Sequence, residues 1–177
     1  RLELEALRDS LLFVSGALDP EPPAPGYLAG NGSRGRSRVR GEIGFDDPYR
    51  TIYLPVLRDL LPDEYGVFDF PDPSSVNGLR HVTTAPPQAL FFMNSGFVQE
   101  AADRTVGRLL KSDDSTRKRV IAAYRTILGR EPEAAEIEDA SALMQSLDDS
   151  GNRDAETFRW AALVQALLSS AEFRYVL

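Results

Sequence analysis

One stretch of the sequence, 80–95, places polar side chains with directional hydrogen bonding among apolar neighbours. Five of its polar residues would need partners if they were buried: Arg80, Thr83, Thr84, Gln88 and Asn94. A buried polar group without a partner costs about 1–3 kcal/mol, so each of them needs a partner if the stretch is buried. The partners that we expect are charged residues elsewhere in the chain, namely Arg8, Asp9, Arg58, Asp69 and Asp72.

These residues allow two interpretations. The first is a structural network that fixes the geometry between a first helix, a connecting segment and a second helix, and we favour it. The second is that the same side chains form the wall of a ligand site. The two interpretations differ in geometry, because a ligand site needs the side chains to converge on an open cleft.

Other polar residues invite chemical hypotheses that we consider weaker. Asp46-Asp47 and the pair Asp69/Asp72 could offer oxygen ligands to calcium, but neither has the spacing of a known calcium loop, which favours aspartates in turns. Paired carboxylates could also hydrolyse glycosides, which requires a cleft that the sequence does not reveal. His81 could act as a haem ligand or general base, yet a lone histidine beside threonines is more often hydrogen-bonded or exposed.

Absent motifs and the composition exclude several classes of function. The sequence has no P-loop, no G-x-G-x-x-G, no H-E-x-x-H and no G-x-S-x-G motif. With 0 Cys and 1 His, disulfides, thiolate metal sites and multi-histidine sites are excluded. A net charge of −7 argues against nucleic acid as a partner, and no apolar run is long enough to span a membrane. We therefore predict no cofactor and no self-contained catalytic site.

Helical periodicity dominates the elements that position these residues. Apolar residues at three- and four-residue steps predict a first helix over Leu2–Leu18, ended by Asp19-Pro20. Later helices are predicted over Gln88–Met93, Phe97–Leu110, Ser112–Leu128, Pro132–Leu147 and Ala155–Ser169. Ser95 is a suitable N-cap, and Gly129 suits a position just past a helix end. The last helix is apolar nearly all round, which indicates a central place. The fold class is mainly α, a helical bundle of five to six helices.

The remaining segments divide the chain, which we predict to be a single helical domain over 1–177. Residues 20–50 are rich in Pro, Gly and Arg and read as a long flexible loop. Residues 51–86 form a short extended connector, with a strand over Thr51–Leu57 and with Tyr65, Phe68 and Phe70 inserted into the core. Residues 87–177 form the bundle. Since the chain opens inside a helical pattern without an initiator Met or signal peptide, we expect it to be excised from a larger protein.

The loop also carries a separate binding hypothesis. Four arginines lie at alternate positions within it, Arg34, Arg36, Arg38 and Arg40. They could bind a polyanion such as an anionic glycan, in which case the affinity would fall with salt. A solvated loop explains the same residues more simply.

Several ordered landmarks along the chain resemble one known family. They are Glu5–Leu12 with Ser15-Gly16, Tyr53–Arg58, Phe68–Asp72, Thr83–Leu90 with Asn94-Ser95, and Glu172-Phe173-x-Tyr175. Together they resemble domain-of-unknown-function family 1553, the C-terminal part of large exported proteins of planctomycetes. A Gly-Gly-Pro turn typical of that family is replaced here by Pro22–Gly26, so a function that needs this turn is in doubt.

The resemblance implies an exported protein, periplasmic or at the cell surface, with neighbouring domains of the same polypeptide as partners. We therefore expect a non-catalytic structural or ligand-binding module of a larger exported multidomain bacterial protein, with polysaccharide as the ligand that its setting implies. The alternative is a domain that contributes residues to an envelope enzyme, an oxidoreductase linked to a cytochrome-like domain. In that case Arg8, Asp9, Arg58, Arg80 and Gln88 would line a shared cleft.

Overall fold

The computed structural model describes residues 1–24, 44–56, 61–111, 115–147 and 155–176. Six longer helices account for most of this part of the chain: α1 (Leu4–Ser15), α3 (Pro86–Asn94), α4 (Gly96–Leu109), α5 (Thr116–Leu128), α6 (Ala134–Ser146) and α7 (Ala155–Ser169). Three shorter elements complete it: the 3₁₀ helix η1 (Thr51–Tyr53), α2 (Asp63–Val67) and α8 (Ala171–Arg174). No strand occurs among the described residues, so the predicted mainly α bundle is confirmed.

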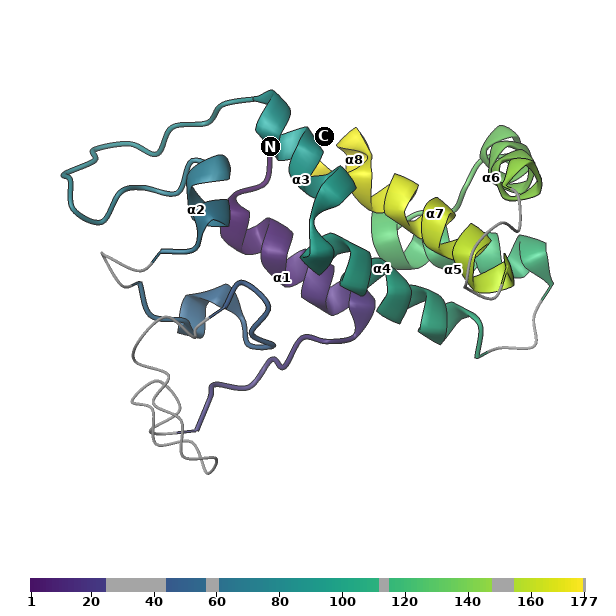
Figure 1. The fold of residues 1–177 in the computed structure, drawn as a ribbon, viewed down its shortest axis with the longest axis horizontal. Helices are drawn as coiled ribbons and strands as arrows, with labels where there is room; N and C mark the ends of the chain where they lie inside the picture. The colour runs from purple at the N-terminus through teal and green to yellow at the C-terminus, as the bar shows by residue number, and fades with distance from the viewer. Residues whose placement is uncertain (25–43, 57–60, 112–114, 148–154, 177) are drawn as a thin grey trace.

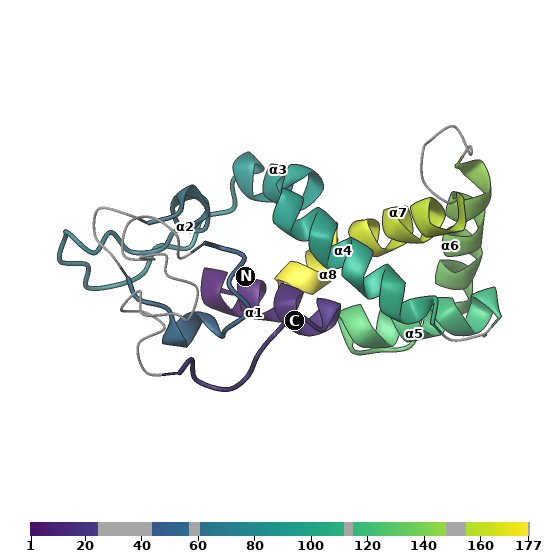
Figure 2. The ribbon, with the colours of Figure 1, turned by 60° about the horizontal axis from the view of Figure 1, so that its bottom comes forward.

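Helix α7 is the centre of the bundle, as its composition predicts. It packs against α3, α4, α5, α6 and α8, and Figures 1 and 2 both show it running between α6 and α8. Its side chains Trp160, Leu163, Val164, Leu167 and Leu168 are all buried. Both predicted limits of this helix are correct.

Helix α1 packs against α4 and carries the connector on its other side (Figure 1). It ends at Ser15, three residues before the predicted end. The reason is Gly16, which adopts a left-handed conformation with φ 71° and lets the N–H groups of Ala17 and Leu18 bond to the carbonyl of Leu12. A glycine therefore ends this helix, and the prediction that Asp19-Pro20 ends it is wrong.

The connector contains turns where we predicted a strand. Thr51–Tyr53 forms the single 3₁₀ turn η1, and α2 follows a few residues later. The strand prediction is wrong because a strand needs a neighbour to pair with, and the described residues offer only an isolated bridge between Asp19 and Tyr49.

The connector aromatics do enter the core, as predicted. Tyr65 and Phe68 are buried, and Phe70 packs edge-on against Tyr65 with ring centroids 4.7 Å apart. Phe68 makes a similar contact with Phe91 of α3 at 5.2 Å. The connector is thereby attached to the bundle through apolar contacts.

The starts of α4, α5 and α6 test the residues that were predicted to begin these helices. Ser95 caps α4 by accepting a hydrogen bond from the Phe97 N–H at 3.2 Å, as predicted. Helix α5 begins at Thr116 and not at Ser112, and residues 112–114 lie outside the described residues. Helix α6 begins at Ala134, so Pro132 precedes the helix, and the Glu136 carboxylate accepts the N–H of Glu133 at 2.7 Å.

Candidate functional site

The first polar cluster surrounds Arg8, whose side chain is completely buried. Its Nε donates to the carbonyl of Phe45 at 2.8 Å, and its Nη1 donates to the carbonyl of Tyr49 at 2.9 Å and to the Thr51 hydroxyl at 3.1 Å. Its Nη2 donates to the carbonyl of Asp47. A single side chain of α1 thus binds the backbone of residues 45–51 at three points.

Asp9 binds the same segment from the next position of α1. Its Oδ1 accepts the N–H of Thr51 at 2.8 Å and the Thr51 hydroxyl at 2.7 Å. The same oxygen lies 3.5 Å from Nη1 of Arg8, so the buried guanidinium has a counter-charge. Burial lowers the pKa of Arg8, whereas the charges of Tyr65 and Asp9 act in the opposite direction.

The second polar cluster is centred on Asp69, which has a left-handed backbone with φ 61°. Its carboxylate accepts the N–H of Thr83 at 2.8 Å, the Thr83 hydroxyl at 2.9 Å and Nη2 of Arg1 at 2.7 Å. Burial raises the pKa of Asp69, but these hydrogen bonds outweigh it and hold the pKa below its usual value. Gln88 adds to the cluster, because its Nε2 donates to the Thr83 hydroxyl at 3.3 Å and to the Val67 carbonyl at 3.1 Å.

Arg80 joins the connector to the start of α1. Its two terminal nitrogens donate to the two carboxylate oxygens of Glu5 at 2.9 and 2.8 Å, and Nη1 lies 2.8 Å from Glu3. The guanidinium also lies over the ring of Phe70, 5.2 Å from its centroid. The hydrogen bonds to Glu5 raise the pKa of Arg80, so its charge is permanent.

The structure therefore divides the predicted residues into separate groups. Arg8 and Asp9 form one cluster, and Asp69, Thr83 and Gln88 form the other. Arg80 is held apart from both by its ion pair with Glu5.

Three other predicted residues, Thr84, Asp72 and Asn94, stand apart from both clusters in the described part of the chain. Thr84 lies 3.3 Å from the hydroxyl of Tyr175 near the end of the chain. Asp72 accepts the N–H of Ser74 at 2.8 Å within its own turn. Asn94 is exposed at the end of α3 and bonds to none of the others in the described part of the chain. Arg58 lies outside the described residues, as do the loop arginines at 34–40.

Sequence reasoning missed three charged partners at the start of the chain and one further arginine. Arg1, Glu3 and Glu5 bind the connector, but nothing in their residue types identified Asp69 and Arg80 as their partners. Arg130 follows the helix-ending Gly129, which has φ 72°. It binds Glu136 of α6 at 2.6 Å and Glu172 of α8 at 2.6 Å.

Arg130 thereby connects three helices, because its guanidinium also lies over the ring of Tyr124 of α5, 5.5 Å from the centroid. Hydrogen bonds from Arg130 and from the Glu133 N–H lower the pKa of Glu136 to about 2. The hydrogen bonds from Arg130 also lower the pKa of Glu172.

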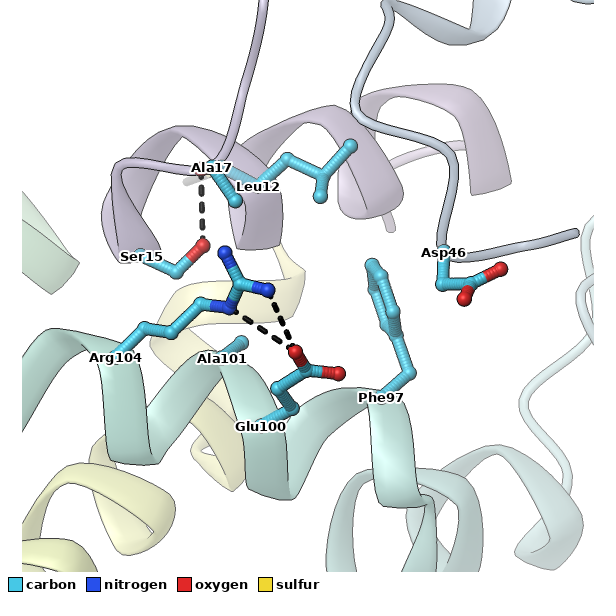
Figure 3. Close-up of a pocket in the computed structure, with 8 residues that line it drawn as sticks. All are labelled: Leu12, Ser15, Ala17, Asp46, Phe97, Glu100, Ala101 and Arg104. Carbon is cyan, nitrogen blue, oxygen red and sulfur yellow. Dashed lines mark hydrogen bonds and ion pairs between the residues drawn. The ribbon is translucent and has the colours of Figure 1, made fainter. Parts of the chain in front are cut away.

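The surface of the described residues has three hollows that matter here. One of about 220 Å³ is lined by Asp69, Asp72 and Arg80, so three predicted residues do meet at a hollow. A second of about 80 Å³ lies between α1 and α4; in Figure 3 the ion pair of Arg104 and Glu100 crosses its floor and Asp46 stands at its edge. The third, about 710 Å³, lies beside Trp160. Arg8, Asp9 and Gln88 line none of these three.

The described residues contain no cluster of three His, Asp or Glu side chains that could hold a metal ion. This includes the aspartates of the calcium hypothesis, where Asp47 is instead buried beside Arg8. None of the helices in the described ranges has the length and apolar character needed to cross a membrane.

Comparison with known proteins places the chain in a family. Residues 1–144 match the model of the family described as PSD1, protein of unknown function (DUF1553). No curated protein and no solved structure matched the chain. Since the match covers most of the 177 residues and includes both polar clusters, the chain belongs to the DUF1553 family.

Proposed function

We propose that this chain is a non-catalytic module that acts by shape and attachment. Its polar residues hold residues 45–51 and the irregular connector that follows them against the helices. The observation that carries the proposal is the hydrogen bonding of Arg8, a buried cation whose N–H groups donate to backbone carbonyls of residues 45–51. The second cluster is similar, since the carboxylate of Asp69 is occupied by Thr83 and Arg1.

The envelope-enzyme alternative requires a shared cleft. Arg8 and Asp9 face residues 45–51, whereas Arg80 binds Glu5 and Gln88 binds Thr83. Groups that are divided in this way and already paired do not leave a set of free side chains aimed at one reacting atom. We therefore favour the module.

The larger setting belongs to the proposal as well. We also propose that the chain is part of a larger exported bacterial protein, at the periplasm or cell surface, as the family resemblance implies. On this view the partners are neighbouring domains of the same polypeptide.

Unfolding free energies distinguish the two functions. Catalytic polar groups are commonly held at the expense of stability, so their replacement tends to leave stability unchanged or to raise it. Replacement of a structural polar group instead lowers the stability. We expect Asp9→Asn, Asp69→Asn and Gln88→Leu each to lower the unfolding free energy by about 1–3 kcal/mol in urea titrations.

Asn94→Ala is the matched control, because Asn94 is a predicted polar residue that is exposed and outside both clusters. It should change stability by less than about 0.5 kcal/mol. If the three cluster variants were as stable as the wild type or more stable, the proposed function would be wrong.

A further inference from the structure

The hollow of about 220 Å³ in the connector has features of a binding site for a small ligand. Its volume is below the roughly 300–1,000 Å³ of sites for drug-sized molecules, so it fits a single small ring. The side chains that concern us are Phe70, Asp72, Asn77, Leu79, Arg80 and His81. All of them belong to one segment of the connector.

The walls of this hollow are fixed before any ligand arrives. Asp69 at its base has a left-handed backbone, which is unfavourable for a residue with a side chain and is often found at functional sites. Thr83 and Arg1 hold the Asp69 carboxylate, and Glu5 holds Arg80. A site that is ordered in advance loses less entropy when it binds a ligand.

Three exposed residues of the hollow have side-chain hydrogen-bonding groups that no described residue occupies. Asp72 uses Oδ1 for the N–H of Ser74, and its other oxygen has no partner among the described residues. Asn77 uses its amide nitrogen for the Asp72 carbonyl and the Ser75 hydroxyl, which leaves its side-chain oxygen. His81 makes no side-chain hydrogen bond within the described ranges.

The charges of the hollow restrict the ligand. An anion would meet the carboxylates of Asp69 and Asp72, while the charge of Arg80 is already matched by Glu5 and Glu3. A metal ion would lack the three donor residues that it needs. A purely apolar ligand would leave Asp72, Asn77 and His81 without partners.

We propose that this hollow binds a neutral sugar ring. The hydroxyl groups of a sugar donate to Asp72 and Asn77 and exchange hydrogen bonds with His81. Its C–H face packs on Leu79, which is 85% exposed. This binding function goes beyond the structural role of the two clusters, which stands whether or not the hollow takes a ligand.

His81 allows a direct test because it is the only histidine of the chain. Its ring gives one set of imidazole signals in two-dimensional NMR of the 177-residue protein. We expect these signals to shift in a saturable way with a methyl glycoside of glucose, galactose or N-acetylglucosamine. One small ring in an open hollow should bind with a Kd on the order of 1–10 mM.

Two variants and a control locate the binding. Asn77→Ala should weaken the affinity at least about fivefold because the ligand loses an acceptor, and Asn94→Ala should leave it unchanged. Asp72→Asn keeps an acceptor for the Ser74 N–H and removes only the charge, so it reports on the ligand even if Asn77→Ala disturbs the loop. We expect it also to weaken the affinity.

Three results would overturn the proposal: no saturable shift with any of the glycosides, a saturable shift with inorganic phosphate or calcium instead, or unchanged glycoside affinity in Asp72→Asn. None of them would affect the unfolding test of the structural role.

Discussion

At the scale of single residues, Arg8 shows how a buried charge is held by hydrogen bonds to the backbone. Moving a guanidinium out of water is costly, and the cost is recovered only when good hydrogen bonds and a counter-charge replace the solvent. Here the carbonyls of Phe45, Asp47 and Tyr49 supply the hydrogen bonds and Asp9 supplies the charge. The same contacts satisfy backbone carbonyls of a segment that has no regular structure.

We predict that Arg8→Leu lowers the unfolding free energy by about 3 kcal/mol or more, because it leaves three backbone carbonyls and Asp9 without their partner. Arg104→Leu is the matched control. Arg104 also lies on a long helix, but its ion pair with Glu100 joins two side chains that are 55% and 58% exposed, which is worth only about 0.3–0.5 kcal/mol. Equal losses in chemical denaturation of the two variants would contradict the role of Arg8.

The sequence pointed to Arg8, Asp9, Asp69, Arg80, Thr83 and Gln88 because polar residues stand there among apolar ones. It could not assign their partners. Arg8 binds mainly backbone carbonyls, which every residue has and which no residue type reveals. Asn94 is also a polar residue among apolar ones, but it is exposed. The side of a helix that a residue faces changes from one position to the next, and in a short helix the sequence does not reveal it.

At the scale of the elements, glycines set two helix ends. Gly16 has φ 71°, and a Cβ at this position would lie 2.8 Å from Nη1 of Arg108. That nitrogen donates to the carbonyl of Val14 at 2.8 Å. A Cβ would therefore displace the flexible end of Arg108, and the left-handed backbone is the stronger constraint on this position.

We expect Gly16→Ala to lower the unfolding free energy by about 1–2 kcal/mol, from the left-handed backbone and the contact with Arg108. Gly107→Ala is the matched comparison, because Gly107 lies inside α4 with nothing within 4 Å of its added Cβ. That change should raise the unfolding free energy by about 0.5–1 kcal/mol, since alanine favours a helix. Thermal unfolding of both variants gives the signs, and a stabilised Gly16→Ala would refute the account of this helix end.

The ion pairs of Arg130 make the contact between α5, α6 and α8 dependent on pH. The pKa of Glu136 falls from 4.5 to about 2 in the folded protein. A lowered pKa adds stability that is fully present above about pH 4.5 and is lost as the pH falls toward 2. The pKa of Glu172 is shifted in the same direction. The gain is modest, because both carboxylates are partly exposed and screened by solvent.

Accordingly, Glu136→Gln should be less stable than the wild type at pH 7, and the difference should shrink as the pH falls from 4.5 to 2. Urea titrations at a series of pH values measure this difference. The exposed Glu138→Gln should show no such dependence. A difference between wild type and Glu136→Gln that stays constant down to pH 2 would be inconsistent with the ion pair.

The limits of the elements were predictable where the signal is local. Both ends of α7 and the Ser95 cap follow from the sequence alone. The predicted end of α1 is wrong because the prediction relied on Asp19-Pro20. Gly16 comes earlier in the chain and already ends the helix. The segment Thr51–Tyr53 is rich in strand-forming residues but forms a 3₁₀ turn. The N–H and the hydroxyl of Thr51 both donate to Asp9, a partner distant in the sequence that local patterns do not reveal.

At the scale of the whole molecule, the bundle and the connector are held by different forces. The bundle buries the apolar faces of its helices around α7. Apolar residues at helical spacing predict such faces from the sequence. The connector has a few buried aromatics and depends for the rest on hydrogen bonds to α1. This is why the fold class could be predicted and the geometry of the connector could not.

The central claim is that hydrogen bonds from polar side chains fix the connector and the residues just before it. Hydrogen exchange at the amides of Thr51 and Thr83 tests it most directly, because both N–H groups donate to a carboxylate, of Asp9 and of Asp69 respectively, at 2.8 Å. We predict exchange at least about 100-fold slower than in an unstructured peptide, and loss of the Thr51 protection alone in Asp9→Ala. Exchange of both amides at the rate of an unstructured peptide in the wild type would contradict the claim.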